Sequence, residues 1–415
     1  MGAWSYETNK PPMAPQTHLH TDLLGLLRQH SRCRDQRHLV LLAWMVLGLL
    51  LSETVCFDRW KSVLPLGYCF AGSWQRRVQR WLSNCRIEIG PLYGGLILWA
   101  LQHWQKPGER LLLALDTTML WNRYCVVVVS VVVHGRAIPV LWQTLEHSSA
   151  SISAEISIAM LEKVDQLLVD FGAITLLADR GFPCADLLRW FDGKTRWQYL
   201  MRLPADTIIH GTAAPLGCQV RRLRLPLGYC RGLEDVQLWS KGQQNVNLLL
   251  ANPAGIKIDE PWYLVTNAIP ALDLVWNYAN RFCCEQLFRD QKGGLFQLEW
   301  SGLRDQERID RLLLVVAIAV LVGSLQGYAV SQEGLRHQVD PHWQRGMSFM
   351  KIGVRWFQEA VANAGKTLLD WIPIPQKKLE PCVPSRAVAR RKKEIWFTRV
   401  ELPPQPPQPL RWAVA

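Results

Sequence analysis

The ten residues from Tyr124 to Val133, YCVVVVSVVV, constrain the fold more than any other stretch of the chain. β-Branched residues dominate the run, and such residues favour a strand. Gly135 then turns the chain into another short strand, Ala137–Trp142. The run therefore predicts the second strand of a sheet that opens with antiparallel hairpins.

The segments around this run alternate in a recognisable order. The run before it, Arg110–Asp116, is apolar, ends in an acid and precedes a turn-like Thr117-Thr118 pair. The segments after it are a helix with apolar residues at helical spacing, a buried strand that precedes Asp179, a short helix and a fifth strand: Ser151–Phe171, Ala173–Ala178, Pro183–Phe191 and Trp197–Leu203. The order is that of a ribonuclease H-like α/β domain: three strands, a helix crossover, a strand, a helix and a strand.

The rest of the chain surrounds this domain. Residues 204–265 hold short, turn-punctuated runs and predict a basic, mostly β insertion, with strands at Thr207–His210, Gln219–Leu225, Val236–Trp239, Val246–Leu250 and Trp262–Val265. We expect a helical N-terminal region over 1–106, the ribonuclease H-like domain over 107–203 and 266–330, and a helical C-terminal region with a basic, proline-rich tail over 331–415. The fold class is thus α/β, a mixed sheet flanked by helices and interrupted by the insertion.

Four functional side chains share one stripe of a predicted helix, Asn277–Gly294. Tyr278, Arg281, Glu285 and Lys292 are spaced by three, four and seven residues, which places them within about 60° of one another. The Gly293-Gly294 pair supplies the helix end. A phenol, a guanidinium, a carboxylate and an ammonium on one stripe indicate a site for an anion beside a metal.

The acids that end the two strands complete this site. Asp116 and Asp179 emerge at the same edge of the sheet if their strands are neighbours, and the helix that carries Glu285 can pack against that edge. Three clustered carboxylates repel one another unless a hard cation lies between them. Oxygen ligands favour Mg²⁺ or Mn²⁺, and two such ions can clamp a phosphodiester during in-line displacement.

These residues resemble the three boxes of the DDE transposases of bacterial insertion sequences. The boxes are Leu115–Thr118, Ala178–Phe182 and the Y-R-E-K spacing of Tyr278, Arg281, Glu285 and Lys292. The likeness covers about residues 108–330. It implies that Asp116, Asp179 and Glu285 bind two Mg²⁺ ions, with Mn²⁺ able to substitute, and that they cut and join DNA strands.

The resemblance also implies the DNA contacts. Tyr278, Arg281 and Lys292 would grip the DNA end, and Arg180 would hold a phosphate or pair with a carboxylate. Some relatives stack a flipped base on a tryptophan of the insertion; Trp239 and Trp262 are the two candidates, beside the alternative that either one packs in the core. Because transposition joins two ends, we expect a homodimer on double-stranded DNA.

Charge supports a polyanionic partner. The chain has a formal net charge of +12 over 415 residues, and nucleic acid is the commonest such partner. Arg76, Arg77 and Arg80 form one face of an amphipathic helix that suits DNA recognition in a helix-turn-helix manner, or else a solvated basic face. The run Arg390–Lys393 is either a further nonspecific contact or a solvated tail.

The sequence leaves two other functional classes open and argues against a membrane protein. A nuclease without strand transfer and a silent DNA-binding derivative of a transposase stay open. The apolar runs Leu39–Leu51 and Leu312–Val322 are shorter than a bilayer requires, so we expect no membrane association. The eleven cysteines form no C-x-x-C pair, and with no signal-peptide pattern this indicates a reducing cytoplasm, where the protein would meet the bacterial nucleoid.

Overall fold

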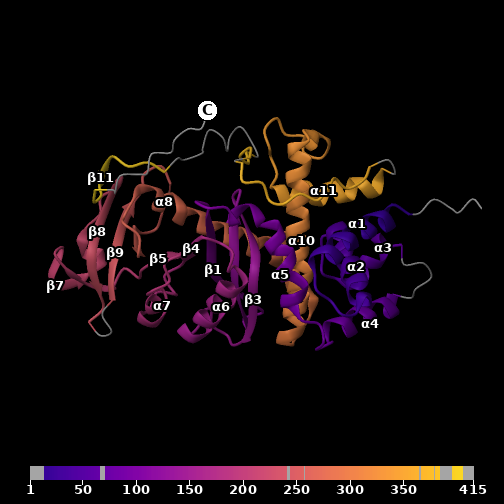
Figure 1. Ribbon diagram of the computed structural model, residues 1–415, viewed down its shortest axis with the longest axis horizontal. Helices are drawn as coiled ribbons and strands as arrows, with labels where there is room; N and C mark the ends of the chain where they lie inside the picture. Colours follow the sequence, from indigo (N-terminus) through magenta and orange to yellow (C-terminus); the bar gives the residue numbers. More distant parts are fainter. Residues whose placement is uncertain are drawn as a thin grey trace, which may run out of the picture.

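The strands in the described part of the chain join in one 11-stranded sheet (Figure 1). The structure is a computed structural model that describes residues 14–65, 71–240, 244–256, 258–363, 366–377, 379–383 and 395–404. The strand order is β3-β2-β1-β4-β5-β10-β9-β8-β6-β7, with β11 paired to β8. Figure 1 shows the catalytic strands in the middle, the insertion at one end and the N-terminal helices at the other.

The first five strands have the predicted ribonuclease H-like topology. They are β1 (Arg110–Leu120), β2 (Tyr124–Val133), β3 (Arg136–Glu146), β4 (Ala173–Ala178) and β5 (Trp197–Arg202). β1 pairs antiparallel with β2 and parallel with β4, and β4 pairs parallel with β5. The crossovers contain α6 (Ala154–Leu167) and α7 (Ala185–Trp190). The mixed α/β fold class predicted from the sequence is confirmed.

The insertion continues the same sheet. Its strands are β6 (Ile208–Gly211), β7 (Ala214–Gln219), β8 (Tyr229–Leu238) and β9 (Gln244–Asn252), and β10 (Trp262–Thr266) returns the chain to pair with β5. The predicted strand at Gln219–Leu225 is wrong. The strand there precedes this stretch, and Val220–Leu223 forms a 3-10 turn because backbone N–H groups of Val220 and Arg221 bond back to Thr207 and Ala205.

Helices form the N-terminal region, as predicted. They are α1 (Pro15–His30), α2 (Gln36–Ser52), α3 (Phe57–Val63), α4 (Ala71–Leu82) and α5 (Ile89–Ala100), followed by a 3-10 turn at Gln102–Gln105. α2 is apolar on nearly all sides and is covered by α1, α3 and α10 (Gln306–Gln332). α4 buries Trp74, Val78 and Trp81 and leaves its arginine face exposed.

The 27-residue helix α10 lies between the sheet and the N-terminal helices (Figure 1). The helix continues past Val322, where the apolar run Leu312–Val322 ends, so by length and composition it could cross a bilayer. The expectation that this segment is too short to span a membrane is therefore wrong. Its most apolar window is 100% buried in the protein, where it packs on α2, β3 and α11 (Phe349–Ala362). The added turns hold Gly327, where a methyl group would overlap the carbonyl oxygen of Phe349.

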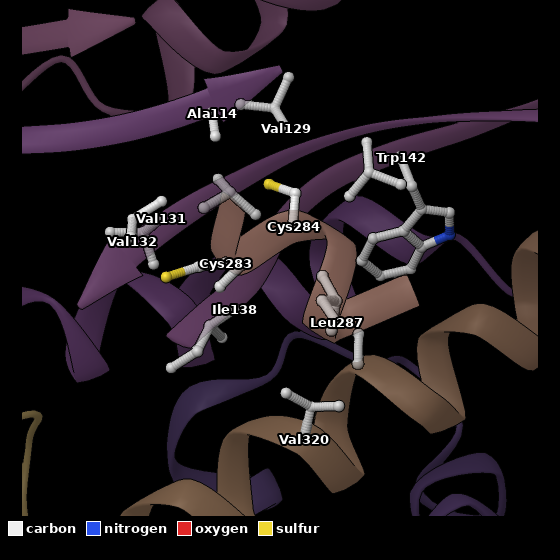
Figure 2. Close-up of a cluster of buried hydrophobic side chains, with 14 of the residues drawn as sticks. Ala114, Val129, Val131, Val132, Ile138, Trp142, Cys283, Cys284, Leu287 and Val320 are labelled. Carbon is white, nitrogen blue, oxygen red and sulfur yellow. The ribbon is translucent and has the colours of Figure 1, made fainter. Parts of the chain in front are cut away.

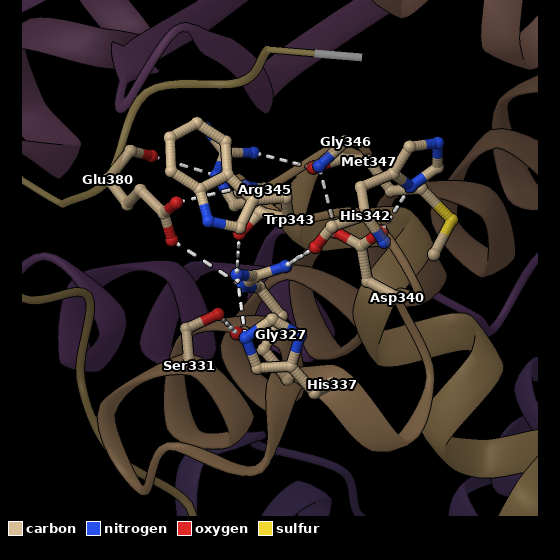
Figure 3. A network of polar contacts seen from close by, with 11 residues as sticks. Gly327, Ser331, His337, Asp340, His342, Trp343, Arg345, Gly346, Met347 and Glu380 are labelled. Carbon is tan, nitrogen blue, oxygen red and sulfur yellow. Dashed lines mark hydrogen bonds and ion pairs between the residues drawn. The ribbon is translucent and has the colours of Figure 1, made fainter. Parts of the chain in front are cut away.

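A polar network fixes the chain beyond α10 (Figure 3). The fully buried Asp340 carboxylate accepts hydrogen bonds from the Arg336 guanidinium at 3.3 Å and the Gly346 N–H at 2.8 Å. The Glu380 carboxylate accepts the backbone N–H of Arg345 at 2.9 Å. The network thereby ties the loop between α10 and α11, which includes the 3-10 turn Leu335–Gln338, to residues 379–383. Further on, β11 (Arg399–Glu401) pairs with β8.

Candidate active site

Asp116 lies in β1 at the point where the pairing of β1 with β4 ends. The last parallel pair is Leu115 with Ala178, so Asp116 and Asp179 both come one residue after a matched pair. Residues at matched positions of neighbouring strands point to the same side of a sheet. The two aspartates therefore emerge together, as the sequence predicts.

The first strand itself is longer than predicted. β1 does not end at Asp116, and Thr117 and Thr118 do not form a turn; they pair with Val127 and Val126 of β2. The turn lies further on, at Trp121 and Asn122, which both have positive φ values, 50° and 52°. β-Branched threonines suit the extended backbone. Thr117 also orients the acid, because its N–H donates to Asp116 Oδ1 at 2.8 Å.

The segment that carries Glu285 is not one regular helix. It comprises α8 (Leu272–Ala279), a 3-10 turn at Asn280–Phe282, α9 (Cys283–Arg289) and a π-helical turn at Asp290–Gly294. The Asn280 side chain donates to the Trp276 carbonyl, a local bond that competes with regular helical pairing. The predicted single helix Asn277–Gly294 is wrong in this respect, although its backbone stays right-handed throughout.

Packing of α9 on the sheet directs Glu285 away from the core. Cys283, Cys284 and Leu287 are buried among Val129, Val131, Ile138, Trp142 and Val320 of β2, β3 and α10 (Figure 2). Glu285 lies on another side of α9, and its side chain is 54% exposed. The apolar stripe of α9 thus anchors the helix while the carboxylate faces the β1 and β4 acids.

One guanidinium joins two of these three acids. Arg281 Nη1 donates to Asp116 Oδ2 at 3.0 Å, and Nη2 donates to Glu285 Oε1 at 3.2 Å. The Arg281 side chain is only 5% exposed. Burial opposes its charge and lowers its pKa, but the surrounding negative groups, including Asp179, Asp116 and Glu285, more than offset this effect, and the net pKa rises.

The electrostatics of the acids reflect their proximity. Burial raises the pKa of the Asp116 carboxyl to about 6; Arg281 opposes this rise, while the charges of Asp179 and Glu285 add to it. Asp179 Oδ1 is buried and has no hydrogen-bond partner among the described residues. A buried carboxylate oxygen without a donor requires a compensating partner.

The acids do not form a ready-made metal cluster. Within the described part of the chain, no group of three His, Cys, Asp or Glu side chains is arranged to hold an ion. Asp116 and Glu285 instead bond different nitrogen atoms of Arg281, so the guanidinium bridges the two carboxylates. The sequence predicts the convergence of the acids, but not the cation that stands between them.

Tyr278 and Trp262 belong to the core beneath this site. Their rings meet edge to face with centroids 5.3 Å apart, and both residues are at most 1% exposed. Burial raises the pKa of the Tyr278 phenol to about 12, so the phenol is neutral near pH 7. Trp239, the other candidate for base stacking, follows β8 with a φ of 60° and is half-buried.

Arg180 and Lys292 form no ion pair with the three acids among the described residues. Arg180 is 59% exposed and forms an ion pair with Glu260 at 3.0 Å, which Arg202 also contacts at 2.6 Å. Of the two roles considered for Arg180, this arrangement shows pairing with a carboxylate. Lys292 lies half-buried in the π-helical turn. The Arg202–Glu260 pair joins β5 to the insertion and carries no signal in the sequence.

The arginines of α4 lie on a separate basic surface. Arg76 and Arg80 line an open depression with Ser73, Gln79, Ser83 and Arg308 of α10, whereas Arg77 is exposed outside it. Sequence reasoning missed Arg308, since nothing in the sequence links α4 to the start of α10. A larger cavity of about 930 Å³, between Arg34 and Arg86, is also in the N-terminal helices, away from the acids. The run Arg390–Lys393 lies outside the described residues.

The structure thus combines a ribonuclease H-like sheet with three acids, one on β1, one after β4 and one on a helix beyond the insertion. Residues 123–322 match the family model of the transposase DDE domain. The matched region covers slightly less than half of the chain, contains Asp179 and Glu285, and begins just after Asp116. The match supports an enzyme of the nuclease and transposase kind.

Two further comparisons add little. No curated protein matches the chain. Among solved structures, the fold is similar to the piggyBac transposase, determined by cryo-EM in a synaptic complex with hairpin DNA. The TM-score is 0.45 and the identity 10%, over 84% of this chain and 79% of that one. At this level of similarity nothing about function follows.

Proposed function

We propose that the protein is a cut-and-paste transposase of the insertion-sequence type with the Y-R-E-K signature. It would cleave DNA strands at the ends of its element and transfer the freed 3′-hydroxyl to target DNA. One observation carries this proposal: Asp116 and Glu285, from distant parts of the chain, both bond the buried Arg281 guanidinium, and the charge of Asp179 acts on the same group. The transposase DDE domain match supports the same reading.

The donor set suits a divalent cation. DDE transposases use divalent metal ions, and three carboxylates with an unpartnered buried Asp179 oxygen are the hard oxygen ligands that Mg²⁺ and Mn²⁺ prefer. Asp116, Asp179 and Glu285 would hold such ions, two by analogy with the family. When bound, the ions would supply an activated nucleophile and stabilise charge on the leaving oxygen.

The chain's own residues prepare the site. Thr117 orients Asp116 through its N–H, and the buried stripe of α9 holds Glu285 in place. Phosphates of the DNA end would approach from the exposed side of Glu285, where Lys292 and Arg180 can contact them. Tyr278, being buried, would support the position of Arg281 through packing unless the site opens.

DNA recognition would extend to the N-terminal region. We propose that Arg76, Arg77 and Arg80 contact DNA phosphates and that residues 1–106 form a DNA-binding domain beside the catalytic segments 107–203 and 266–330. A homodimer on two DNA ends, formed at the bacterial nucleoid, would complete the assembly. The basic net charge of +12 favours each of these contacts.

Strand joining tests this function against its rivals. The substrate is a pre-cleaved duplex copied from the DNA that borders the coding region, mixed with protein, plasmid and Mg²⁺. We expect covalent joining of the 3′-end to the plasmid. Cutting of an uncleaved duplex without joining would indicate a nuclease, and binding without either reaction would indicate a silent derivative.

A further inference from the structure

Arg281 bonds the same carboxylate oxygens that a divalent cation would need. Its two terminal nitrogens hold Asp116 Oδ2 and Glu285 Oε1, and the other Asp116 oxygen already accepts the Thr117 N–H. Each oxygen of Asp116 therefore accepts a hydrogen bond, and Oδ2 faces a fixed positive charge while Arg281 stays. An ion and the guanidinium compete for one set of ligands.

We propose that Arg281 is a positioning residue that takes the place of a cation between the acids, and that a DNA phosphate releases it so that metal can bind. This inference rests on the proposed function, because it assigns the three acids to a divalent ion. It makes Arg281 more than a phosphate contact: the residue sets the metal affinity of the site and couples that affinity to DNA.

The contacts of Arg281 suit such an exchange. Its contact with Glu285 is the longer of the two, and Glu285 is half-exposed, so solvent weakens this pair. Arg281 Nε is buried without a hydrogen-bond partner among the described residues. A phosphate can accept two parallel hydrogen bonds from a guanidinium. A DNA phosphate beside Glu285 would therefore replace the carboxylates as the partner of Arg281.

The exchange makes DNA and metal cooperative. If phosphate withdraws Arg281 from the acids, DNA raises the affinity for metal, and metal raises the affinity for DNA by the same factor. The protein without DNA would bind divalent ions weakly. The protein would then cut DNA only after a DNA end has bound, which limits metal-dependent cleavage of other DNA.

The first experiment measures Mn²⁺ binding by electron paramagnetic resonance of the free ion at pH 8, with no DNA and no assay of activity. We expect Arg281→Gln to bind Mn²⁺ about tenfold more tightly than wild type, within the usual range of such couplings. Arg289→Gln is the matched control, because Arg289 is an exposed arginine of the neighbouring helix α9 and forms no ion pair with the three acids among the described residues. It should change the affinity less than twofold. Equal or weaker binding by Arg281→Gln would overturn the inference.

Arg281→Gln could fail to fold, and circular dichroism would show this. A second, more conservative variant therefore tests the same inference. Arg281→Lys keeps the charge, but one ammonium cannot reproduce two bonds from separate nitrogens. It should bind Mn²⁺ more tightly than wild type by a smaller factor, and wild-type affinity in a folded Arg281→Lys protein would again contradict the exchange.

The second experiment adds a short duplex from the DNA that borders the coding region, with the Mn²⁺ held by the duplex alone subtracted. DNA should raise the Mn²⁺ affinity of wild type at least fivefold and that of Arg281→Gln distinctly less. An equal rise in both proteins would overturn the release by phosphate. Asp116→Asn separates the two proposals: if it binds Mn²⁺ as well as wild type, the metal site itself is wrong, whatever Arg281 does.

Discussion

The Arg281 guanidinium donates a hydrogen bond of 3.0 Å to the Asp116 carboxylate, 165 residues earlier in the chain. The contact joins the segment between α8 and α9 to the first strand of the sheet, across the whole β insertion. It also places Glu285, the second partner of Arg281, over the end of the β1–β4 pairing. The geometry of this one side chain brings the predicted acids into a single site.

Glu285→Gln should abolish DNA cutting and leave DNA binding within about twofold of wild type. The change would remove a proposed metal ligand, but the half-exposed side chain is not part of the core. Cleavage of a duplex from the element border with Mg²⁺, and a mobility shift without divalent ions, measure the two properties. Normal cutting by this variant would remove Glu285 from the site.

Arg76→Ala and Arg80→Ala should each reduce the slope of log affinity against log salt by about 1, as loss of one phosphate contact predicts. Both residues line the depression that Arg308 completes, and Arg308→Ala should act in the same way. Arg59→Ala, an exposed arginine of α3, is the control. Unchanged slopes for all of the depression variants would assign the α4 face to solvent.

Gly327→Ala should destabilise the protein by at least about 1–3 kcal/mol, because a methyl group there meets the backbone of Phe349, which cannot rotate away. Gly323→Ala, one turn earlier on α10, is the matched control. Its added methyl would find only ordinary contacts with Met350 and Val354, and alanine favours a helix over glycine by about 1 kcal/mol. Thermal unfolding should separate the variants, and similar midpoints would mean that α10 and α11 do not pack as described.

Asp310→Asn should stabilise the protein increasingly as pH rises. Burial raises the pKa of the Asp310 carboxyl to about 7, despite two hydrogen bonds that Thr144 donates to it. The unfolded carboxyl has a pKa near 4. The folded state therefore keeps a proton that the unfolded state has lost, and stability falls as pH rises from about 4 through 7.

Asparagine can accept both Thr144 bonds and does not titrate. The difference in unfolding free energy between the variant and wild type should therefore grow by roughly 3 kcal/mol from pH 5 to pH 8. Denaturant unfolding at several pH values measures it. Parallel pH profiles for the two proteins would show that Asp310 ionises normally in the fold.

The local sequence predicted the bounds of a strand well where recognisable turn residues follow it. Tyr124–Val133 and Ala173–Ala178 have the predicted bounds, because apolar or β-branched runs there meet clear turn residues. The end of β1 was wrong because Thr117 and Thr118 suit a strand as well as a turn, and only the partner β2 decides between them.

Spacing along one helix predicted that Arg281 and Glu285 face the same side, and the strand order predicted where Asp116 and Asp179 emerge. The sequence could not predict that Arg281 would bond the acids, because that contact depends on how closely α9 approaches β1 in the folded protein. The burial of Tyr278 against Trp262 and the place of Arg308 beside α4 depend on similar long-range packing. Periodicity reports which face of a helix a residue occupies, not what lies opposite.

Iron-directed cleavage of the polypeptide tests the central claim most directly, namely that Asp116, Asp179 and Glu285 share one cation site. Fe²⁺ replaces Mg²⁺ at such a site, and with ascorbate and peroxide it cuts the backbone next to its ligands; mass spectrometry locates the cuts. With border DNA bound, we predict cuts close to residues 116, 179 and 285 in the same sample, all suppressed by excess Mg²⁺ and all lost in Asp179→Asn. Cuts near only one of these residues, or cuts that persist in Asp179→Asn, would contradict a shared site.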